Sequence, residues 1–191
     1  MTIRILALVG SLRAGSYNKQ LAEAAVKCAP DGVDVDIFDN LADVAFYNED
    51  IDRPGAVAAA DRLRVEVQTA DALLLVTPEY NGTVPASLKN AIDWISRPYG
   101  AGAISGKPLA VIGTTNGRYG GAWAHDDARK AASIAGASVL DDVTLSVPHA
   151  ATRFATIHPA HDDEIADAIT TILATLATAV HGQEGRRLCQ K

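Results

Sequence analysis

Short apolar runs alternate along this chain with stretches of helical periodicity. Three of the runs are apolar almost throughout and predict central strands that are covered on both faces, at 2–9, 71–76 and 108–114. Weaker strand patterns follow at 33–37 and 138–147, and helical patterns lie at 18–29, 57–67, 85–96, 122–135 and 165–180. Such alternation predicts an α/β fold, in which a doubly wound, five-stranded parallel sheet carries helices on both faces.

The length of 191 residues fits one domain, which we expect over 1–180, followed by a flexible tail at 181–191. A net charge of -6 leaves little basic surface, so we expect no nucleic-acid partner. We expect no apolar run as long as a membrane span, and the first ten residues lack the pattern of a signal peptide, so we expect no membrane partner. Cys28 and Cys189 are too far apart for a disulfide framework, which favours the cytoplasm.

Two other classes of site have little support. The five histidines show no compact ligand pattern, and Pro159 interrupts the pair His158 and His161, so we predict no metal site. A hydrolase would need a nucleophile elbow of the type Gly-x-Ser-x-Gly, which the sequence lacks. Cys28 fits a small apolar residue in its helix better than a nucleophile.

The first expected strand runs into Gly10-Ser11-Leu12-Arg13-Ala14-Gly15-Ser16-Tyr17-Asn18. Leu12 stands where a dinucleotide fingerprint needs its middle glycine, and Ser16 and Tyr17 replace the Lys and Ser/Thr of a nucleotide-triphosphate loop. Polar side chains at a strand-to-helix junction nevertheless suit one terminal phosphate, because free N–H groups and the positive helix end lie there. An ordinary helix cap with Arg13 in solvent is the alternative.

The third expected strand is followed by Thr77-Pro78-Glu79-Tyr80-Asn81-Gly82-Thr83-Val84-Pro85. A proline-bracketed turn with one aromatic ring offers both an apolar surface and backbone polar groups, which a planar heteroaromatic ligand needs. Glu79 as a catalytic acid or base is the alternative, although no partner carboxylate or histidine is near it in sequence.

The fourth expected strand leads into Gly113-Thr114-Thr115-Asn116-Gly117-Arg118-Tyr119-Gly120-Gly121. Four glycines in nine residues let the main chain approach a ligand closely, while a plain mobile connection remains the alternative. In a doubly wound sheet, loops at the carboxyl ends of the strands share one crevice.

Together these three segments resemble the NAD(P)H-dependent FMN reductases of flavodoxin-like fold. The resemblance spans about 3–147 and is most specific in the run from Thr77 to Trp94. It implies that the FMN phosphate is bound by Ser11, Arg13, Ser16 and Asn18, with Gln20 or Lys19 as a further contact. It implies that the isoalloxazine ring is lined on one side by Pro78, Glu79, Tyr80, Asn81 and Gly82, and on its other edge by Thr115, Asn116 and Gly117.

The same resemblance implies an enzyme in which hydride passes from NAD(P)H through FMN to a quinone, a free flavin or a similar small acceptor. Nicotinamide and acceptor would take turns at one ring face, in a ping-pong reaction, and no side chain is assigned a proton transfer. A non-enzymatic FMN electron carrier of flavodoxin type is the alternative. Relatives commonly assemble, so a homodimer or homotetramer is expected. Core packing is the default interpretation of Leu88, Ile92, Trp94 and Ile95, and a contact between subunits through their helix is the alternative.

Arg118 has two interpretations: contact with the phosphate of a pyridine nucleotide, or an ion pair across a subunit interface. Aromatic residues make up only 5 % of the chain, so rings beside the loops stand out. We expect Tyr80, with Tyr119 and Trp94 behind it, to be the rings that matter at the site.

Overall fold

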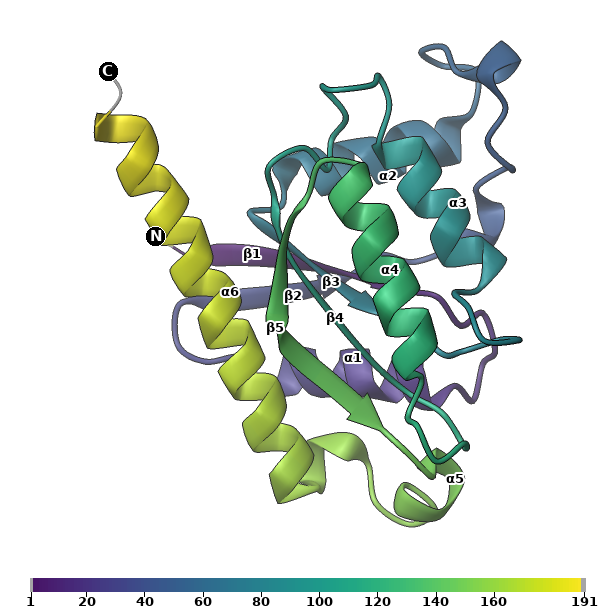
Figure 1. Cartoon of the computed structure of the whole chain (residues 1–191), viewed down its shortest axis with the longest axis vertical. Helices are drawn as coiled ribbons and strands as arrows, with labels where there is room; N and C mark the ends of the chain where they lie inside the picture. The colour runs from purple at the N-terminus through teal and green to yellow at the C-terminus, as the bar shows by residue number, and fades with distance from the viewer. Residues whose placement is uncertain (1, 190–191) are drawn as a thin grey trace.

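The computed structural model describes residues 2–189 and confirms the flavodoxin-like fold (Figure 1). Its five strands form one parallel sheet: β1 (Ile3–Val9), β2 (Val33–Ile37), β3 (Ala72–Val76), β4 (Pro108–Thr114) and β5 (Ser138–Val147). The helices are α1 (Tyr17–Lys27), α2 (Ala58–Thr69), α3 (Ala86–Ile95), α4 (Ala122–Ile134), α5 (Ala150–Arg153) and α6 (Asp163–Cys189). Short 3-10 turns lie at Leu41–Asp43, Glu49–Ile51 and Pro159–His161.

Both faces of the sheet are covered, as the apolar runs predict. In β1, Ile5 and Ala7 enter a core that includes residues of α1 and α6, while Leu6 and Leu8 enter a second core with residues of α2, α3 and α4. The alternation follows from the two-residue period of a strand. An unbroken apolar run is therefore what a central strand of this sheet requires, since each face needs its own apolar side chains.

The strand order is β2-β1-β3-β4-β5, so the chain leaves β1 toward one edge of the sheet and later continues from β3 toward the other. Loops after β1 and β3 therefore diverge and open a crevice at the carboxyl ends of the strands. Ladder bonds continue just beyond the strands: Gly10 N–H donates to Val76 O and Thr77 N–H to Ile112 O, both at 2.9 Å. The three loops singled out in the sequence consequently begin side by side.

Helix α6 departs from the sequence-based expectation in two ways. It continues through Cys189, so the segment expected to be a tail is helical from residue 181 to 189; residues 190 and 191 lie outside the described part. Its segment Asp163–Gln183 is also long and apolar enough to cross a membrane, by length and composition, whereas no such run is predicted from the sequence. Buried helices of soluble proteins share this property. Ile169, Leu173 and Leu176 pack into the core that α6 shares with α1 on one face of the sheet.

Candidate functional site

A cavity of about 440 Å³ lies at the carboxyl ends of β1, β3 and β4. Ten of the predicted residues line it: Ser11, Arg13, Ser16, Asn18, Pro78, Glu79, Tyr80, Thr115, Asn116 and Gly117. Three predicted residues are not among its lining: Gln20, Asn81 and Gly82. Three that were not predicted are: Tyr17, Thr114 and Ala150. The structure thus brings together parts of all three loops and adds a fourth segment, which follows β5.

The first loop presents the N-terminus of α1 to the cavity. Ser16 is the N-cap and is buried; its Oγ accepts a hydrogen bond from Lys19 N–H at 3.3 Å. Arg13 is exposed, and its guanidinium lies 5.8 Å from the centre of the Tyr17 ring. A positive side chain therefore stands beside a positive helix end, an arrangement that favours an anion. Gln20 lies further along α1, where its N–H bonds to Ser16 O.

Asn18 joins the first loop to the third. Its side-chain amide donates to Thr114 O and accepts from Thr114 N–H, both at 2.9 Å, and the side chain is buried. The predicted phosphate contact is therefore already engaged at both ends of its amide. Asn18 acts chiefly as a clamp, which fixes the start of α1 against the end of β4.

The second loop is a tight hairpin. Tyr80 and Thr83 exchange backbone hydrogen bonds of 3.0 and 3.2 Å, and the two residues between them, Asn81 and Gly82, have φ of 53° and 77°. An Asn-Gly pair with both φ positive is the usual centre of a type I′ turn. These two residues are needed for the shape of the turn, which explains why they do not line the cavity, whereas Tyr80 does.

Glu79 has a structural partner across the site. Its Oε2 accepts a hydrogen bond from Ala124 N–H at 3.3 Å, in the first turn of α4. The N-cap of α4 is Gly121, which has no side chain to satisfy that helix end. Glu79 supplies the missing acceptor from a neighbouring loop, so this contact supports a capping role rather than acid–base chemistry.

The third loop is held by the segment after β5. Thr114 Oγ1 donates to Val147 O at 2.7 Å, Ala150 N–H donates to Thr115 O at 3.0 Å, and Ala151 N–H donates to Asn116 Oδ1 at 2.9 Å. These bonds bring Ala150 to the cavity wall. Nothing in the local sequence around Ala150 signals this, because its position depends on the pairing of β5 with β4.

Gly113 allows the second and third loops to approach. A Cβ at this position would overlap Thr77 O and would stand 2.6 Å from His125 Nε2. Any larger residue would push the two loops apart. Glycines in the third loop were predicted to let the main chain approach a ligand. At Gly113 the missing side chain instead allows the segments of the site to pack against one another.

His125 is buried directly beneath these loops, a residue that sequence reasoning did not assign to the site. Its Nδ1 is 2.8 Å from Ser146 Oγ, while Nε2 is buried without a hydrogen-bond partner among the described atoms. Burial, assisted by the nearby Arg129, lowers the pKa of His125 from 6.5 to about 4. The ring is therefore neutral at pH 7 and joins α4 to β5.

Of the rings expected at the site, Tyr80 lines the cavity, whereas Trp94 does not. Trp94 is only 1 % exposed and donates its Nε1–H to Ala45 O at 2.7 Å, so it belongs to the core. Trp123, in contrast, is 58 % exposed and lies 5.6 Å from the Tyr119 ring. Its place in the first turn of α4, immediately after the glycine-rich loop, is the signal that would have identified it.

No group of three or more His, Cys, Asp or Glu side chains within the described residues is arranged to hold a metal ion. His158, three residues before His161, has its Nε2 3.4 Å from Glu23 Oε2. Cys28 ends α1 as its C-cap and is partly exposed rather than buried inside the helix.

Comparison with known proteins is consistent with this arrangement. The family model described as NADPH-dependent FMN reductase matches residues 3–152. An NAD(P)H-dependent FMN reductase of Pseudomonas aeruginosa is 43 % identical over 122 residues, which is 64 % of this chain and 65 % of that protein. A 2-hydroxy-1,4-benzoquinone reductase of a Burkholderia species is 37 % identical over 153 residues, or 80 % of this chain and 82 % of the relative.

A solved structure with the same fold is the flavoenzyme NAD(P)H:(acceptor) oxidoreductase FerB from Paracoccus denitrificans. It superposes with a TM-score of 0.83 at 30 % identity, covering 95 % of this chain and 98 % of that one. The match of the family model to most of the chain, including all three loops that form the cavity, confirms the resemblance seen in the sequence: this protein belongs to the NADPH-dependent FMN reductase family.

Proposed function

We propose that this protein is an FMN-dependent NAD(P)H oxidoreductase that passes reducing equivalents to a quinone, a free flavin or a similar small acceptor. The observation that carries the proposal is the cavity at the switch point of the sheet, which has a cationic helix end on one side and a rigid hairpin on the other. The names of the relatives favour a reductase over the alternative, an FMN electron carrier of flavodoxin type.

The cavity residues fit FMN. Ser11, Arg13 and Ser16, with the free N–H groups of the α1 start, supply donors and positive charge for a phosphate. Tyr80 and Pro78 offer an apolar edge opposite Thr115 and Gly117, where a planar ring needs contact on one side and polar groups on the other.

FMN, when bound, supplies the hydride-accepting chemistry. The chain itself holds the parts of the site in position. Asn18 fixes the start of α1 against β4, and Glu79 anchors the hairpin to α4. Asn116 and Gly117 of the third loop would border the ring and could stabilise negative charge on it through polar groups. Tyr80 would line one side of the ring, and nicotinamide and acceptor would have to use the same remaining face in turn, which predicts ping-pong kinetics.

Reconstitution tests the proposal. Purified protein should be yellow or become so with FMN, and should oxidise NADPH or NADH when a quinone is supplied, with parallel lines in double-reciprocal plots. Protein that takes up no FMN would refute the proposal. Protein that binds FMN but oxidises NAD(P)H only with a partner reductase would instead be the electron carrier.

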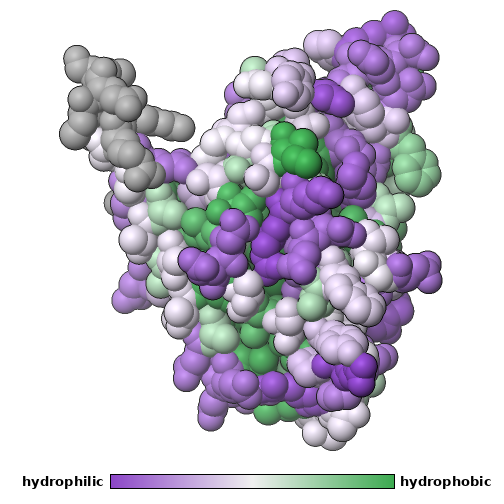
Figure 2. Space-filling model, viewed as in Figure 1, coloured by the Kyte–Doolittle hydropathy of each residue, from purple (hydrophilic) through white to green (hydrophobic). Residues whose placement is uncertain are grey.

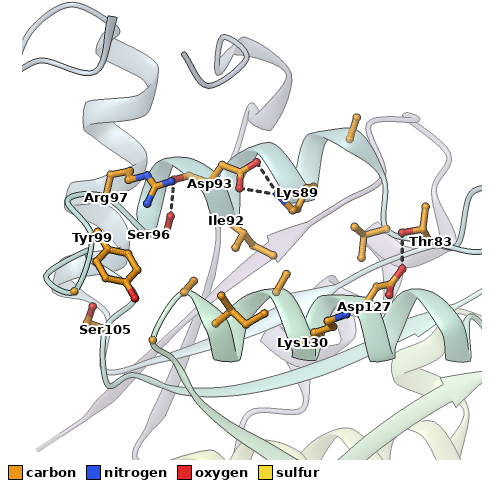
Figure 3. A pocket seen from close by; sticks show the side chains of 17 residues that line it. Thr83, Lys89, Ile92, Asp93, Ser96, Arg97, Tyr99, Ser105, Asp127 and Lys130 are labelled. Carbon is orange, nitrogen blue, oxygen red and sulfur yellow. Dashed lines mark hydrogen bonds and ion pairs between the residues drawn. The ribbon is translucent and has the colours of Figure 1, made fainter. Parts of the chain in front are cut away.

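We further propose that the chain forms a homodimer through a groove of about 910 Å³ between α3 and α4 (Figure 3). Leu88, Ile92, Trp94 and Ile95 are buried in the core, and of the four only Ile92 lines the groove. Exposed apolar side chains at the groove are instead Tyr99, 86 % exposed, and Ile134, 73 % exposed. Figure 2 shows the α4 side as hydrophilic side chains with separate apolar patches.

A second copy suits this groove because its charges are of both signs. On α3, Lys89 Nζ lies 2.7 Å from Asp93 Oδ1, and on α4, Lys130 and Asp127 line the opposite side of the groove. A partner related by two-fold symmetry can therefore place opposite charges together. Thr83 joins the groove to the site, since its Oγ1 donates to Asp127 at 2.6 Å (Figure 3). Light scattering should give twice the chain mass for the wild type and the monomer mass for Ile134→Glu; a monomeric wild type would refute the dimer.

We place this activity in the cytoplasm. The spacing of Cys28 and Cys189 suits a compartment where thiols stay reduced, and the proposed donor NAD(P)H is a cytoplasmic reductant. Fractionation of cells that express the full chain tests this: recovery with the membranes would refute it.

A further inference from the structure

Exposed rings and a cation gather beside the cavity, outside its lining. The Arg118 guanidinium lies 4.5 Å from the centre of the Tyr119 ring, and the Tyr119 and Trp123 rings are 5.6 Å apart at an angle of 40°. All three side chains are exposed. We call Arg118, Tyr119 and Trp123 the rim cluster. In a chain with so few aromatic residues, two large exposed rings next to one site need an explanation.

The rim cluster is joined to the second and third loops of the site. Arg118 follows the cavity residue Gly117 directly in the chain. Trp123 precedes Ala124, whose N–H bonds to the cavity residue Glu79, and a Cβ built on Gly82 would lie 3.7 Å from the Trp123 ring. Trp123 therefore rests on the hairpin tip, and a ligand that reaches out of the cavity between these loops meets the cluster first.

We propose that the rim cluster binds the adenosine half of NAD(P)H, with the adenine ring on Trp123 and Tyr119 and the phosphates at Arg118. This rests on the proposed function. A dinucleotide has two ring systems joined by a diphosphate, so its adenine half must lie outside the FMN cavity when its nicotinamide contacts the flavin. Aromatic side chains stack on any base, and a guanidinium pairs with phosphate.

The charge pattern supports Arg118 as the phosphate contact. Arg118 makes no ion pair with any other residue of the described chain. The nearby start of α4 already faces a carboxylate, because Glu79 accepts from Ala124 N–H there. An anionic ligand at the rim thus finds its cation in Arg118 rather than in the helix end.

Tryptophan fluorescence gives a readout that does not depend on turnover. The chain has two tryptophans, and Trp94 is buried, so a ligand at the rim should affect Trp123 alone. Titration of the FMN-loaded dimer with ADP-ribose, which lacks nicotinamide, should quench the fluorescence saturably, and Trp123→Phe should abolish this response. 2′-Phospho-ADP-ribose in a parallel titration distinguishes the diphosphate from the 2′-phosphate as the group that Arg118 binds.

Kinetics should separate binding from chemistry. Trp123→Ala and Arg118→Ala should each raise the KM for NADPH roughly 10-fold and change kcat less than about twofold, because stacking and ion pairing act before and during hydride transfer alike. Phe46→Ala, an exposed ring elsewhere, and Arg62→Ala, whose guanidinium lies 5.0 Å from the Phe38 ring centre, are matched controls that should leave KM unchanged.

Two results would overturn the inference while leaving the proposed function intact. In the first, FMN-loaded protein turns over normally, yet ADP-ribose quenches nothing and neither rim variant changes KM. In the second, acrylamide reaches Trp123 only after Ile134→Glu has separated the subunits, which would make the rim an interface. A protein that binds no FMN would refute the function instead, and ADP-ribose quenching of that protein would still report on the rim.

Discussion

The cavity at the strand ends and the groove between α3 and α4 are built by different means. The groove has about 910 Å³ and lies between two helices whose side chains of both charge signs surround apolar ones. The cavity has about 440 Å³ and is lined largely by loop residues that converge from four segments. Size and apolar character alone would select the groove, but only the cavity joins the capped N-terminus of α1 to loops that follow β1, β3 and β4. The difference teaches that chemistry in this fold is located by convergent polar groups.

The largest difference between the two regions is expected when a negative charge is introduced at the start of α1, beside the cavity. In Ser16→Asp the new side chain can still cap α1, but its carboxylate faces a bound phosphate, so the affinity for FMN should fall roughly 1000-fold. Titration of FMN fluorescence measures it. Ser105→Asp makes the same change at the groove and should leave FMN affinity as it was; equal losses in both would contradict the assignment of the cavity.

Acid should weaken the cavity region through His125. Its folded-state pKa of about 4 is below the unfolded value near 6.5, so the unfolded chain binds the proton first as the pH falls. The stabilising contribution linked to His125 is fully present above pH 6.5. As the pH falls from 6.5 to 4 it is lost, and the free energy of unfolding decreases by on the order of 3 kcal/mol. Urea unfolding at several pH values measures this slope. His125→Gln should flatten it, and an unchanged slope would show that other groups are responsible.

Two buried asparagines offer a matched pair, one for each region. Asn18 clamps Thr114 at the cavity, and Asn90 on α3 binds Tyr47 N–H and the carbonyl oxygens of Val44 and Ala45. Replacing either by Ala leaves backbone groups without partners and should cost about 2 kcal/mol of unfolding free energy. Only Asn18→Ala should also weaken FMN binding. If Asn90→Ala weakens it equally, the clamp at the cavity has no special role.

The smallest effect is expected at two glycines with positive φ. Gly82 has φ of 77° in the hairpin, and Gly100 has φ of 76° at the groove, so Ala at either position should cost about 1 kcal/mol in thermal unfolding. Gly82→Ala should in addition alter acceptor KM, because the hairpin carries Tyr80. Gly100→Ala is its control and should leave the kinetics unchanged.

The sheet, its order and most of the cavity could be predicted because they depend on local patterns. An apolar run of seven residues that ends in glycine has few uses other than a central strand with a ligand loop. Ala150 could not be predicted, since only the pairing of β5 with β4 brings it to the cavity. Asn81 and Gly82 were predicted at the site and do not line the cavity, because a turn and a binding loop demand the same residue types and only backbone angles separate them.

The helical continuation of α6 beyond residue 180 was missed for a related reason. Gly182 and Gly185 and a polar composition favour a tail, but the segment contains no proline, and Gln, Arg and Leu sustain a helix that is already nucleated. Trp94 was mistaken for a site ring because its position after the hairpin is close in sequence, while its indole turns into the core. Proximity along the chain did not indicate which face of α3 it occupies.

The bond between Asn18 and Thr114 also has a consequence for the order of assembly. It joins residues 96 positions apart, so closing it requires β1, β3 and β4 to be paired already. We therefore expect this end of the cavity to be completed late in folding, so that the cofactor binds to an already folded protein. Cells starved of riboflavin should accumulate folded, colourless protein that turns yellow within the time of simple diffusion and binding.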